Sequence, residues 1–345
     1  MKALVYHGPG KQAWEERPDP KLIKPTDAIV KIDKTTICGT DLHIMRGHVP
    51  TAEEGRILGH EGVGTVLEVG PQVKSVQVGQ KVLISCITAC GHCRSCQKSF
   101  FGHCEDGGWL LGNTIDGCQA EYVRIPHADN SLHVLPPNVD EEACVMLSDI
   151  FPTAYEVGIL AGQFQPGKTL AVVGAGPVGL AAVLASQLLS PAEIIVIDQN
   201  PFRLEVAKSF GATQVFDNSK NQAVEKIMEY TKGYGVEVVI EAIGLPVGWE
   251  ISEQIVSAGG NIAILGVHGK PAVFHLETMW KRNFTMTAGL VHTYTIPMFL
   301  KMAMNNKIEL KKMISHHFKL SDVVQAYHTF TNASEFNSLK MMLTN

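Results

Sequence analysis

The sequence predicts an α/β protein with two domains: a mainly antiparallel β domain, followed by a doubly wound parallel sheet. The length permits two domains, because 345 residues exceed one ordinary compact core, and 45% of them are hydrophobic. Residues 1–150 carry alternating stretches, separated by Gly and Pro, that are typical of half-buried strands: AIVKIDK (28–34), VGTVLEV (63–69) and AEYVRI (120–125). From about residue 167, short apolar runs alternate with helical segments, which indicates a parallel sheet. The six runs are TLAVV (169–173), EIIVI (193–197), TQVF (213–216), EVVI (237–240), NIAIL (261–265) and FTMTAG (284–289).

Helix punctuation supports this second domain. Asn200 is a suitable N-cap with Pro201 at the first helical position, and Gly211 can end the same helix. The tail from about residue 292 shows no strand rhythm, so we expect it to pack back on the first domain without adding strands.

Charge and hydropathy limit the partners. The net charge of -5 includes no basic stripe, so nucleic acid is not an expected partner. The start MKALVYHGPGKQ lacks an apolar signal core, and no apolar run is long enough to cross a membrane. We therefore expect a cytoplasmic protein whose eight cysteines are metal ligands or buried thiols rather than disulfides.

A glycine-rich turn follows the run 169–173 and opens an apolar helix over 178–189. In this strand-turn-helix setting, glycines let the backbone approach a pyrophosphate at the helix N-terminus. Asp198 ends the next strand, where a carboxylate can bind the adenosine ribose and repel a 2′-phosphate. The sequence therefore predicts NAD rather than NADP, although a plain connecting turn and a helix-start Asp remain alternatives. The predicted turn residues are Gly174, Gly176, Pro177, Val178 and Gly179.

Four cysteines lie close together in one stretch: Cys90, Cys93, Cys96 and Cys104. Four thiolates can surround one tetrahedral ion, and a site without an open position is structural, so we expect zinc to hold this lobe, about residues 86–112. An iron–sulfur cluster or disulfides are alternatives, but the spacing departs from the bacterial cluster pattern.

A second metal site is indicated by Cys38, in the run ICGTDLH, and by His60 in the run GHE. Cys and His supply two of the three protein ligands that a catalytic zinc needs. The run Gly59-His60-Glu61-x2-Gly64-x5-Gly70-x2-Val73 resembles the zinc signature of the medium-chain dehydrogenase/reductase superfamily.

Over essentially its whole length, the chain resembles the zinc-containing alcohol dehydrogenases of that superfamily. The resemblance implies a GroES-like catalytic domain at 1–150, completed by 292–345, a Rossmann domain at 151–291 and an active site in the cleft between them. It also implies that Cys38 and His60 bind the catalytic zinc and that Glu61 can exchange onto the metal.

The third permanent ligand is expected in the stretch before Thr153. Many relatives have cysteine there, whereas this chain, aligned through Thr153, presents Asp149. Carboxylate oxygen is an acceptable zinc ligand, so we predict Asp149, with Cys144 as competitor and a helix-capping Asp as the structural alternative.

The resemblance places a proton relay at Thr40 and His43, because a zinc-bound alcohol acidifies toward neutral pH and its proton needs an exit. Asp41 is expected to hydrogen-bond His60 and orient its ring. An ordinary backbone-bonded hydroxyl and a packed loop histidine are the alternatives for Thr40 and His43.

Further contacts are expected at the cofactor and the substrate. Predicted cofactor residues, besides the glycine turn and Asp198, are Thr153, Arg203, Ile243, Leu265 and Val267. Trp109 and Ile87 are candidates for the substrate pocket wall, and His292 is a residue to watch near the cleft. Cys86, Cys118 and Cys144 are interpreted as buried thiols.

The predicted function is reversible hydride transfer between a small primary or secondary alcohol and NAD, with two zinc ions per subunit. A polyol or formaldehyde dehydrogenase of the same superfamily is the alternative enzyme, and a non-catalytic NAD-binding protein is the alternative of another class. By resemblance, we expect a homotetramer.

Overall fold

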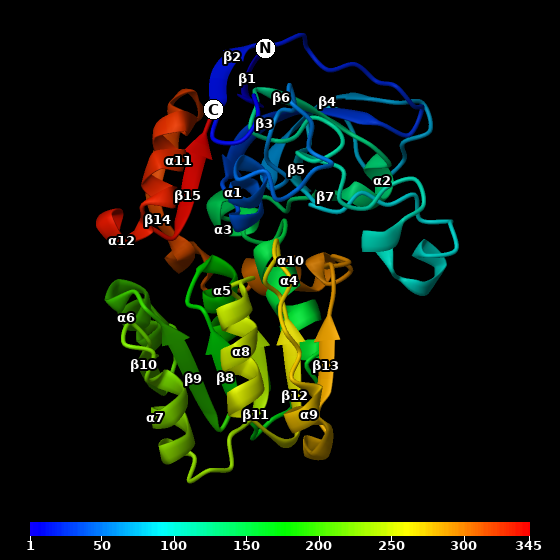
Figure 1. Cartoon of the computed structure of the whole chain (residues 1–345). Helices are drawn as coiled ribbons and strands as arrows, with labels where there is room; N and C mark the ends of the chain where they lie inside the picture. Colours follow the sequence, from blue (N-terminus) through cyan, green and yellow to red (C-terminus); the bar gives the residue numbers. More distant parts are fainter. The chain divides into compact units, whose positions relative to one another are not determined.

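The computed structural model describes residues 1–345, and the chain divides into two compact units (Figure 1). One unit comprises Met1–Pro152 and Val291–Asn345, and the other comprises Thr153–Leu290. The boundaries expected from the sequence, at 150/151 and 291/292, lie next to these.

Unit 1 is built on a seven-stranded sheet with the order β14-β15-β3-β4-β5-β7, in which β6 also pairs with β3. Its pairs are antiparallel except β14 with β15, and β1 and β2 form a separate antiparallel pair. The strands are β1 (Lys2–Tyr6), β2 (Gln12–Glu16), β3 (Ala28–Thr36), β4 (Gly62–Val69), β5 (Lys81–Ile84), β6 (Tyr122–Ile125), β7 (Leu132–Val134), β14 (Ile314–Lys319) and β15 (Lys340–Thr344).

The expectation of a tail without strands is wrong, because β14 and β15 both lie in it. β15 reads KMMLT and is buried on both faces, so its apolar run does not alternate and gave no period-2 signal. It pairs with β3 from Met342 opposite Thr36 to Thr344 opposite Lys34. The tail thus completes the sheet of unit 1 instead of merely covering it.

Short helices connect the strands of unit 1. They are α1 (Gly39–Met45), α2 (Ala128–Ser131), α3 (Glu141–Val145), α10 (Ile296–Met304), α11 (Val323–Thr331) and α12 (Ala333–Phe336), with α4 (Ile150–Thr153) at the border of the units. Short 3-10 turns lie at Cys96–Lys98, Phe101–His103, Leu310–Met313 and Leu320–Asp322.

Unit 2 is a six-stranded, all-parallel sheet with the order β10-β9-β8-β11-β12-β13. All six arrowheads point to the same edge (Figure 1). The strands are β8 (Thr169–Val173), β9 (Glu193–Asp198), β10 (Gln214–Asp217), β11 (Val236–Glu241), β12 (Val256–Ile264) and β13 (Thr285–Ala288). The order reverses between β8 and β11, which is where such sheets bind ligands, at the carboxyl ends of the strands.

Helices cross over between these strands: α5 (Pro177–Ser186), α6 (Pro201–Ser209), α7 (Ala223–Tyr230), α8 (Pro246–Ile255) and α9 (Leu276–Met279), with a π-helix at Ala154–Leu160 and 3-10 turns at Gln187–Leu189 and Trp280–Arg282. The predicted capping of α6 is confirmed. The side chain of Asn200 accepts from the amides of Phe202 and Arg203, and Gly211 follows the helix with a φ of 105°.

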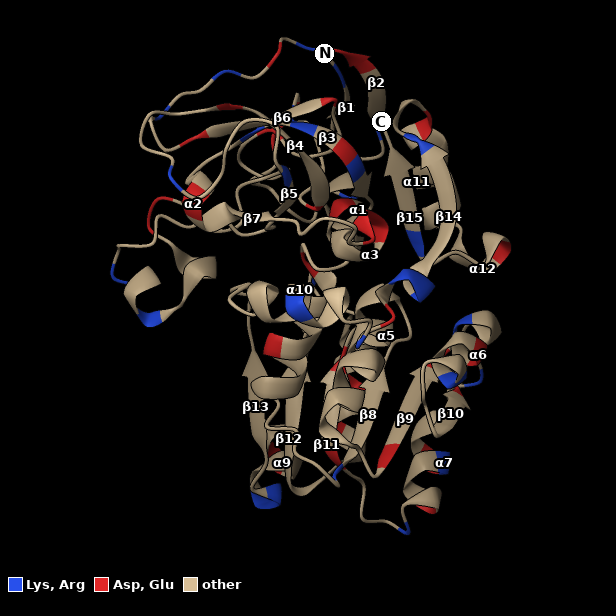
Figure 2. Ribbon diagram, turned by 180° about the vertical axis from the view of Figure 1, so that it is seen from behind, with Lys and Arg blue, Asp and Glu red and all other residues tan.

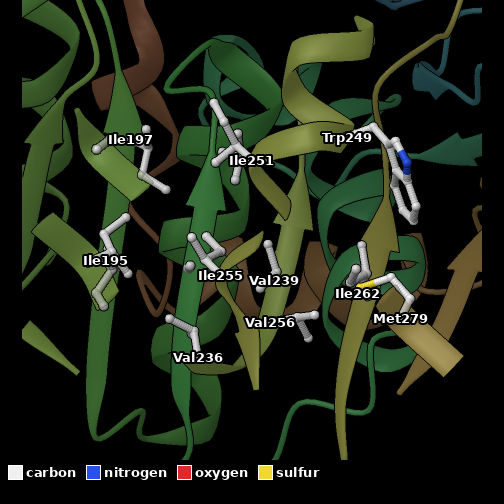
Figure 3. Close-up of a cluster of buried hydrophobic side chains, with 14 residues drawn as sticks. Ile195, Ile197, Val236, Val239, Trp249, Ile251, Ile255, Val256, Ile262 and Met279 are labelled. Carbon is white, nitrogen blue, oxygen red and sulfur yellow. The ribbon is translucent and has the colours of Figure 1, made fainter. Parts of the chain in front are cut away.

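The core of unit 2 lies between α8 and the sheet (Figure 3). Ile195 of β9, Val239 of β11 and Ile262 of β12 pack in one cluster with Trp249 and Ile255 of α8. The central strands β8, β9 and β11 are buried on both faces, which explains their continuous apolar runs in the sequence. Truncating one such buried isoleucine to alanine would lower the free energy of unfolding by about 2–5 kcal/mol. This core therefore stabilises the sheet whose carboxyl edge is the predicted cofactor site.

No helix in the chain is both long enough and apolar enough to cross a membrane. Acidic and basic residues alternate along the outer helices, for example on α6 and α7 (Figure 2).

Candidate active site and zinc sites

Four potential metal ligands from three segments of unit 1 converge on one point. Cys38 precedes α1, His60 and Glu61 precede β4, and Asp149 lies between α3 and α4. The ligand atoms of these four residues all lie within 4.8 Å of one another. The three segments meet because β3 and β4 are paired and the amide of Cys86 donates to the carbonyl of Ser148, next to Asp149.

The spacing fits a tetrahedral zinc ion. Zinc bound by sulfur at about 2.3 Å and by nitrogen or oxygen at about 2.0 Å requires S–O and N–O separations of about 3.5 and 3.3 Å. The distance from Cys38 Sγ to Asp149 Oδ2 is 3.6 Å, and that from His60 Nε2 to Asp149 Oδ2 is 3.2 Å. One ion can therefore contact all three side chains without movement of the backbone.

The electrostatics of the cluster favour a cation. Burial, together with the charges of Glu61 and Asp149, raises the pKa of the Cys38 thiol. Glu61 Oε1 is buried without a hydrogen-bond partner. An unpaired buried carboxylate oxygen is costly, and a metal ion would both satisfy it and stabilise the thiolate. The donors present, one sulfur, one imidazole nitrogen and carboxylate oxygens, are those that zinc takes in proteins.

The expected support of His60 by Asp41 is only partly formed. Asp41 Oδ1 and His60 Nδ1 approach to 3.5 Å, and neither atom has a hydrogen-bond partner. The other oxygen, Asp41 Oδ2, accepts from the Cys38 amide at 2.9 Å and from Gln119 Nε2 at 3.1 Å. Tyr327 in turn donates to Gln119 Oε1 at 2.9 Å. Asp41 therefore fixes the backbone of one predicted metal ligand while it faces the ring of another.

The predicted relay residues follow Cys38 on α1. The Thr40 hydroxyl lies 3.8 Å from Cys38 Sγ, beside the predicted metal position. His43 is half-buried, and its Nδ1 lies 3.2 Å from Nδ1 of His48. A proton on either nitrogen can be donated to the other, so the two imidazoles are close enough for one hydrogen bond.

Of the predicted pocket residues, Trp109 lies at the site. Its ring centroid is 6.1 Å from that of His60 in an edge-on arrangement, and its Nε1 is buried without a partner. Ile87 is fully buried, and Cys144 is not one of the four clustered residues. Burial raises the pKa of the Cys144 thiol to about 12, which is the behaviour of an inert core cysteine.

The four closely spaced cysteines form a second cluster. The sulfurs of Cys90 and Cys96, and those of Cys93 and Cys104, are each 4.0 Å apart, far beyond a disulfide bond. A tetrahedral zinc–thiolate site requires about 3.8 Å between sulfurs. Amide hydrogen bonds, from Glu105 first and then from Cys96, lower the pKa of Cys93 to about 6. The cluster is thus prepared to hold a thiolate and has no fifth protein ligand.

The predicted dinucleotide edge lies in unit 2. Gly174 follows β8 with a φ of 104°, and a Cβ there would lie 2.7 Å from Ile243 Cγ1. A Cβ on Gly179 would lie 1.9 Å from the Gly174 carbonyl, so only glycine allows this turn and helix to pack. Gly176 is the N-cap of α5, with Pro177 and Val178 opening the helix. The N-terminus of α5 therefore presents free amides where a pyrophosphate would bind.

Asp198 stands at the end of β9, beside this turn. Its Oδ2 accepts from the Ala175 amide at 2.7 Å and its Oδ1 from the Asn200 amide at 2.8 Å. Arg203 Nη1 would lie 3.9 Å from a Cβ on Gly176, and its Nε is buried without a partner. Burial lowers the pKa of Arg203, while the charge of Asp198 opposes that shift.

The other predicted cofactor residues lie at the strand ends. Ile243 follows β11, and Leu265 and Val267 follow β12, with the Val267 side chain 41% exposed at this edge. Thr153 is the first residue of unit 2 and is half-buried.

Comparison with known proteins gives a consistent picture. The family model of the alcohol dehydrogenase GroES-like domain matches residues 24–137, and that of zinc-binding dehydrogenases matches residues 177–305. Zinc-type alcohol dehydrogenase B of Aspergillus flavus is 35% identical over 337 residues, covering 96% of this chain and 78% of the relative.

The chain belongs to the zinc-containing medium-chain dehydrogenase/reductase superfamily. Among solved structures, the apo form of zinc dependent alcohol dehydrogenase 2 from Streptococcus pneumonia is 48% identical, with a TM-score of 0.96 and coverage of 100% of this chain and 98% of that one. An Escherichia coli CFT073 alcohol dehydrogenase complexed with NADH is 28% identical, with a TM-score of 0.89 and coverage of 100% and 99%. The predicted GroES-like and Rossmann-type domains are thereby confirmed.

Two residues of this dehydrogenase were missed as site residues by the sequence analysis. Lys340 is fully buried and donates to Glu61 Oε2 at 2.6 Å and to the Ile37 carbonyl at 3.1 Å. Burial lowers the pKa of Lys340, but the Glu61 carboxylate and other neighbours raise it overall. Lys340 thus holds one oxygen of Glu61, while the other, Oε1, is buried without a hydrogen-bond partner. A lysine in the apolar run KMMLT was the available signal, since a charge in a buried strand needs a partner.

Cys86 is the second missed residue. It is buried, and burial together with the charges of Asp149 and Glu61 raises the pKa of its thiol well above the ordinary value. Its neutral thiol therefore lies beside Asp149, next to the four clustered residues. Its position directly before Ile87 was the only signal in the sequence.

Proposed function

We propose that this dehydrogenase is a zinc-dependent alcohol dehydrogenase that transfers a hydride between a small primary or secondary alcohol and NAD. The observation that carries the proposal is the cluster of Cys38, His60 and Asp149, whose spacing of 3.2 to 3.6 Å suits one tetrahedral ion. Glu61 adds a fourth potential ligand atom, an oxygen, that can exchange onto the metal. Three permanent protein ligands leave one position for substrate, which distinguishes a catalytic zinc from a structural one.

When bound, zinc supplies Lewis acidity toward an alcohol oxygen, and NAD supplies the hydride acceptor. The protein then needs to take up the hydroxyl proton. Thr40, beside the predicted metal position, is suited to accept it, and His43 to pass it on. His48, 3.2 Å from His43, extends this path. Asp41 holds the Cys38 backbone, so that the thiolate keeps its direction.

The same proposal includes a structural zinc in the four-cysteine cluster and NAD at the edge of the parallel sheet. The helix N-terminus at Pro177 would receive the pyrophosphate, and Asp198 the adenosine ribose hydroxyls. Asp198 already accepts two backbone amides, so its carboxylate is anchored at this edge. A 2′-phosphate would meet this negative charge, which favours NAD over NADP.

Metal analysis and kinetics of Asp149→Asn test the proposal, with the exposed Asp322→Asn as the matched control. Asp149→Asn should retain the structural zinc, lose most of the catalytic zinc and fall by at least about 100-fold in kcat/KM, since a ligand is removed. The control should keep two zinc ions and full turnover. An Asp149→Asn variant with two zinc ions and normal turnover would refute the assignment.

The wild-type enzyme should be assayed on ethanol, 2-propanol, sorbitol and formaldehyde, each with NAD and with NADP. We expect turnover of the simple alcohols and a preference for NAD. Preferred turnover of sorbitol or formaldehyde would favour the polyol or formaldehyde reaction instead. Absence of turnover on any alcohol, with both zinc sites filled, would favour a non-catalytic role.

We also propose a cytoplasmic homotetramer. The eight cysteines are unpaired, which suits a reducing compartment. Strand β13 is the outer strand of the parallel sheet, and its Met286 is 48% exposed, with Trp280 nearby in sequence at 70%. Such an apolar edge is suited to pair with a second copy. Light scattering on the purified protein measures the assembly, and Met286→Lys should weaken it.

A further inference from the structure

A buried glutamate ends one of the central strands of unit 2. Glu241 is the last residue of β11 and is completely inaccessible to solvent. Burial raises the pKa of its carboxyl, against the opposing effect of amides from Gly244 and Ile243. A buried acid at the ligand-binding edge of a parallel sheet requires partners, and these define what it does.

The partners of Glu241 come from two different loops. Its Oε1 accepts from the amides of Ile243 and Gly244, each at 2.9 Å, in the loop after β11. Its Oε2 lies 3.1 Å from Nε2 of His268, in the loop after β12. With the Glu241 carboxylate ionised, Nε2 of His268 is the donor in this contact, because a carboxylate can only accept. One side chain therefore ties together the loops that leave neighbouring strands.

Close backbone packing makes this tie specific. A Cβ on Gly248 would lie 2.1 Å from Glu241 Oε1, and one on Gly266 would lie 2.6 Å from Glu241 Oε2. Gly244 has a φ of 74°, and a Cβ there would lie 2.6 Å from the Val267 carbonyl. Glycines thus leave just enough space for the carboxylate and bring the two loops into contact.

The glycine-rich turn follows β8, whereas the two loops follow β11 and β12, on the other side of the point where the strand order reverses. In a sheet of this order, one strand group receives the adenosine half of a dinucleotide, and β11, β12 and β13 receive the other half. Gly174 and Asp198 belong to the first group. Ile243, Leu265 and Val267 belong to the loops that Glu241 and His268 connect.

We propose that Glu241 and His268 are positioning residues that lock the loops after β11 and β12 together and so preform the surface that receives the nicotinamide half of NAD. The inference rests on the proposed use of NAD. His268 is the residue of the pair that can be substituted with less disturbance, because its side chain is 22% exposed whereas that of Glu241 is inaccessible. Loss of the imidazole frees the 266–268 loop and costs some stability, because Glu241 Oε2 loses its partner, but Oε1 keeps two amides and the core stays filled, so the variant should fold while cofactor affinity falls.

Binding of NADH and of AMP to His268→Ala tests the proposal, since AMP occupies only the adenosine half. NADH affinity should fall roughly 5- to 10-fold, the value of one partly exposed hydrogen bond to a charged group, while AMP affinity stays within about twofold. His268→Gln keeps an N–H donor and should recover most of the loss. His275→Ala is the control, because His275 ends the same loop, directly before α9, but pairs with Glu253 of α8 at 2.8 Å instead of with Glu241.

Each outcome decides the matter. Unchanged NADH affinity in His268→Ala, or an equal loss for AMP, overturns the inference while the use of NAD stands. A glutamine variant as weak as the alanine variant also overturns it. A wild-type protein that binds AMP but not NADH overturns the proposed cofactor, and this inference with it.

Discussion

Replacing Lys340 with methionine tests the buried ion pair behind the predicted catalytic metal. Methionine has a similar length and can fill the same space without a charge. Both partners are inaccessible, and the ammonium and carboxylate are 2.6 Å apart. Lys340→Met therefore leaves the Glu61 carboxylate buried beside Asp149 and Cys38 without its ammonium partner.

Breaking a buried pair by removing one partner typically costs about 3–5 kcal/mol. The proposed zinc ion would offset part of this cost, because Glu61 is one of the four clustered residues and its Oε1 is buried without a hydrogen-bond partner. For Lys340→Met we therefore expect the free energy of unfolding to fall by nearly the upper value in protein stripped of the catalytic ion, and by roughly half as much in zinc-loaded protein. The double variant Glu61→Gln/Lys340→Met leaves no unpaired charge, so most of the stability should return.

Urea unfolding of the wild type, both single variants and the double variant, each with and without the catalytic ion, measures these differences. The coupling between the two sites should be about 2 kcal/mol or more. Additive effects of the two substitutions, or a Lys340→Met loss independent of zinc, would refute the reasoning that Lys340 and the metal share one carboxylate.

Three further predictions concern other parts of the chain. Cys104→Ser should remove one zinc ion, leave the catalytic one and speed proteolysis of the lobe at 90–104, as metal analysis and limited digestion will show. Asp198→Ala should raise the KM for NAD roughly 10-fold and reduce the ratio of kcat/KM with NAD to that with NADP. Steady-state kinetics with both cofactors measures both changes. Burial lowers the pKa of His133 from 6.5 to about 4, so the unfolded chain binds a proton that the native protein does not. The contribution of neutral His133 to the free energy of unfolding is fully present above pH 6.5 and decreases by up to about 3 kcal/mol as the pH falls toward 4. His133→Phe should abolish this decrease, which urea unfolding at pH 7.5 and at pH 5 measures.

Local patterns were sufficient for the parts of the fold that depend on short stretches of chain. All six strands of the parallel sheet were predicted, because the central strands are continuous apolar runs buried on both faces and the edge strands follow the same alternation with helices. The N-cap at Asn200 and the turn at Gly211 depend only on the conformation of a few residues. The same reasoning failed for β15, whose burial comes from β3 and β14 rather than from its own alternation.

For the candidate site, the sequence indicated which residue types can bind metal and the spacing of those that are neighbours in the chain. The four cysteines at 90–104 are local, and their convergence follows from that spacing. The proximity of Asp149 to Cys38 could only be expected by resemblance, since 111 residues separate them.

By itself, then, the sequence determined the two kinds of domain, the closely spaced thiols and the glycine-rich turn, because backbone geometry over a few residues suffices for each. Tertiary structure alone decided which buried charges meet. Lys340 reaches Glu61 across 279 residues, and His268 reaches Glu241 across 27, through the pairing of strands that no local pattern encodes. A charge removed from water is tolerated only beside its partner, and that partner is chosen by how distant segments pack.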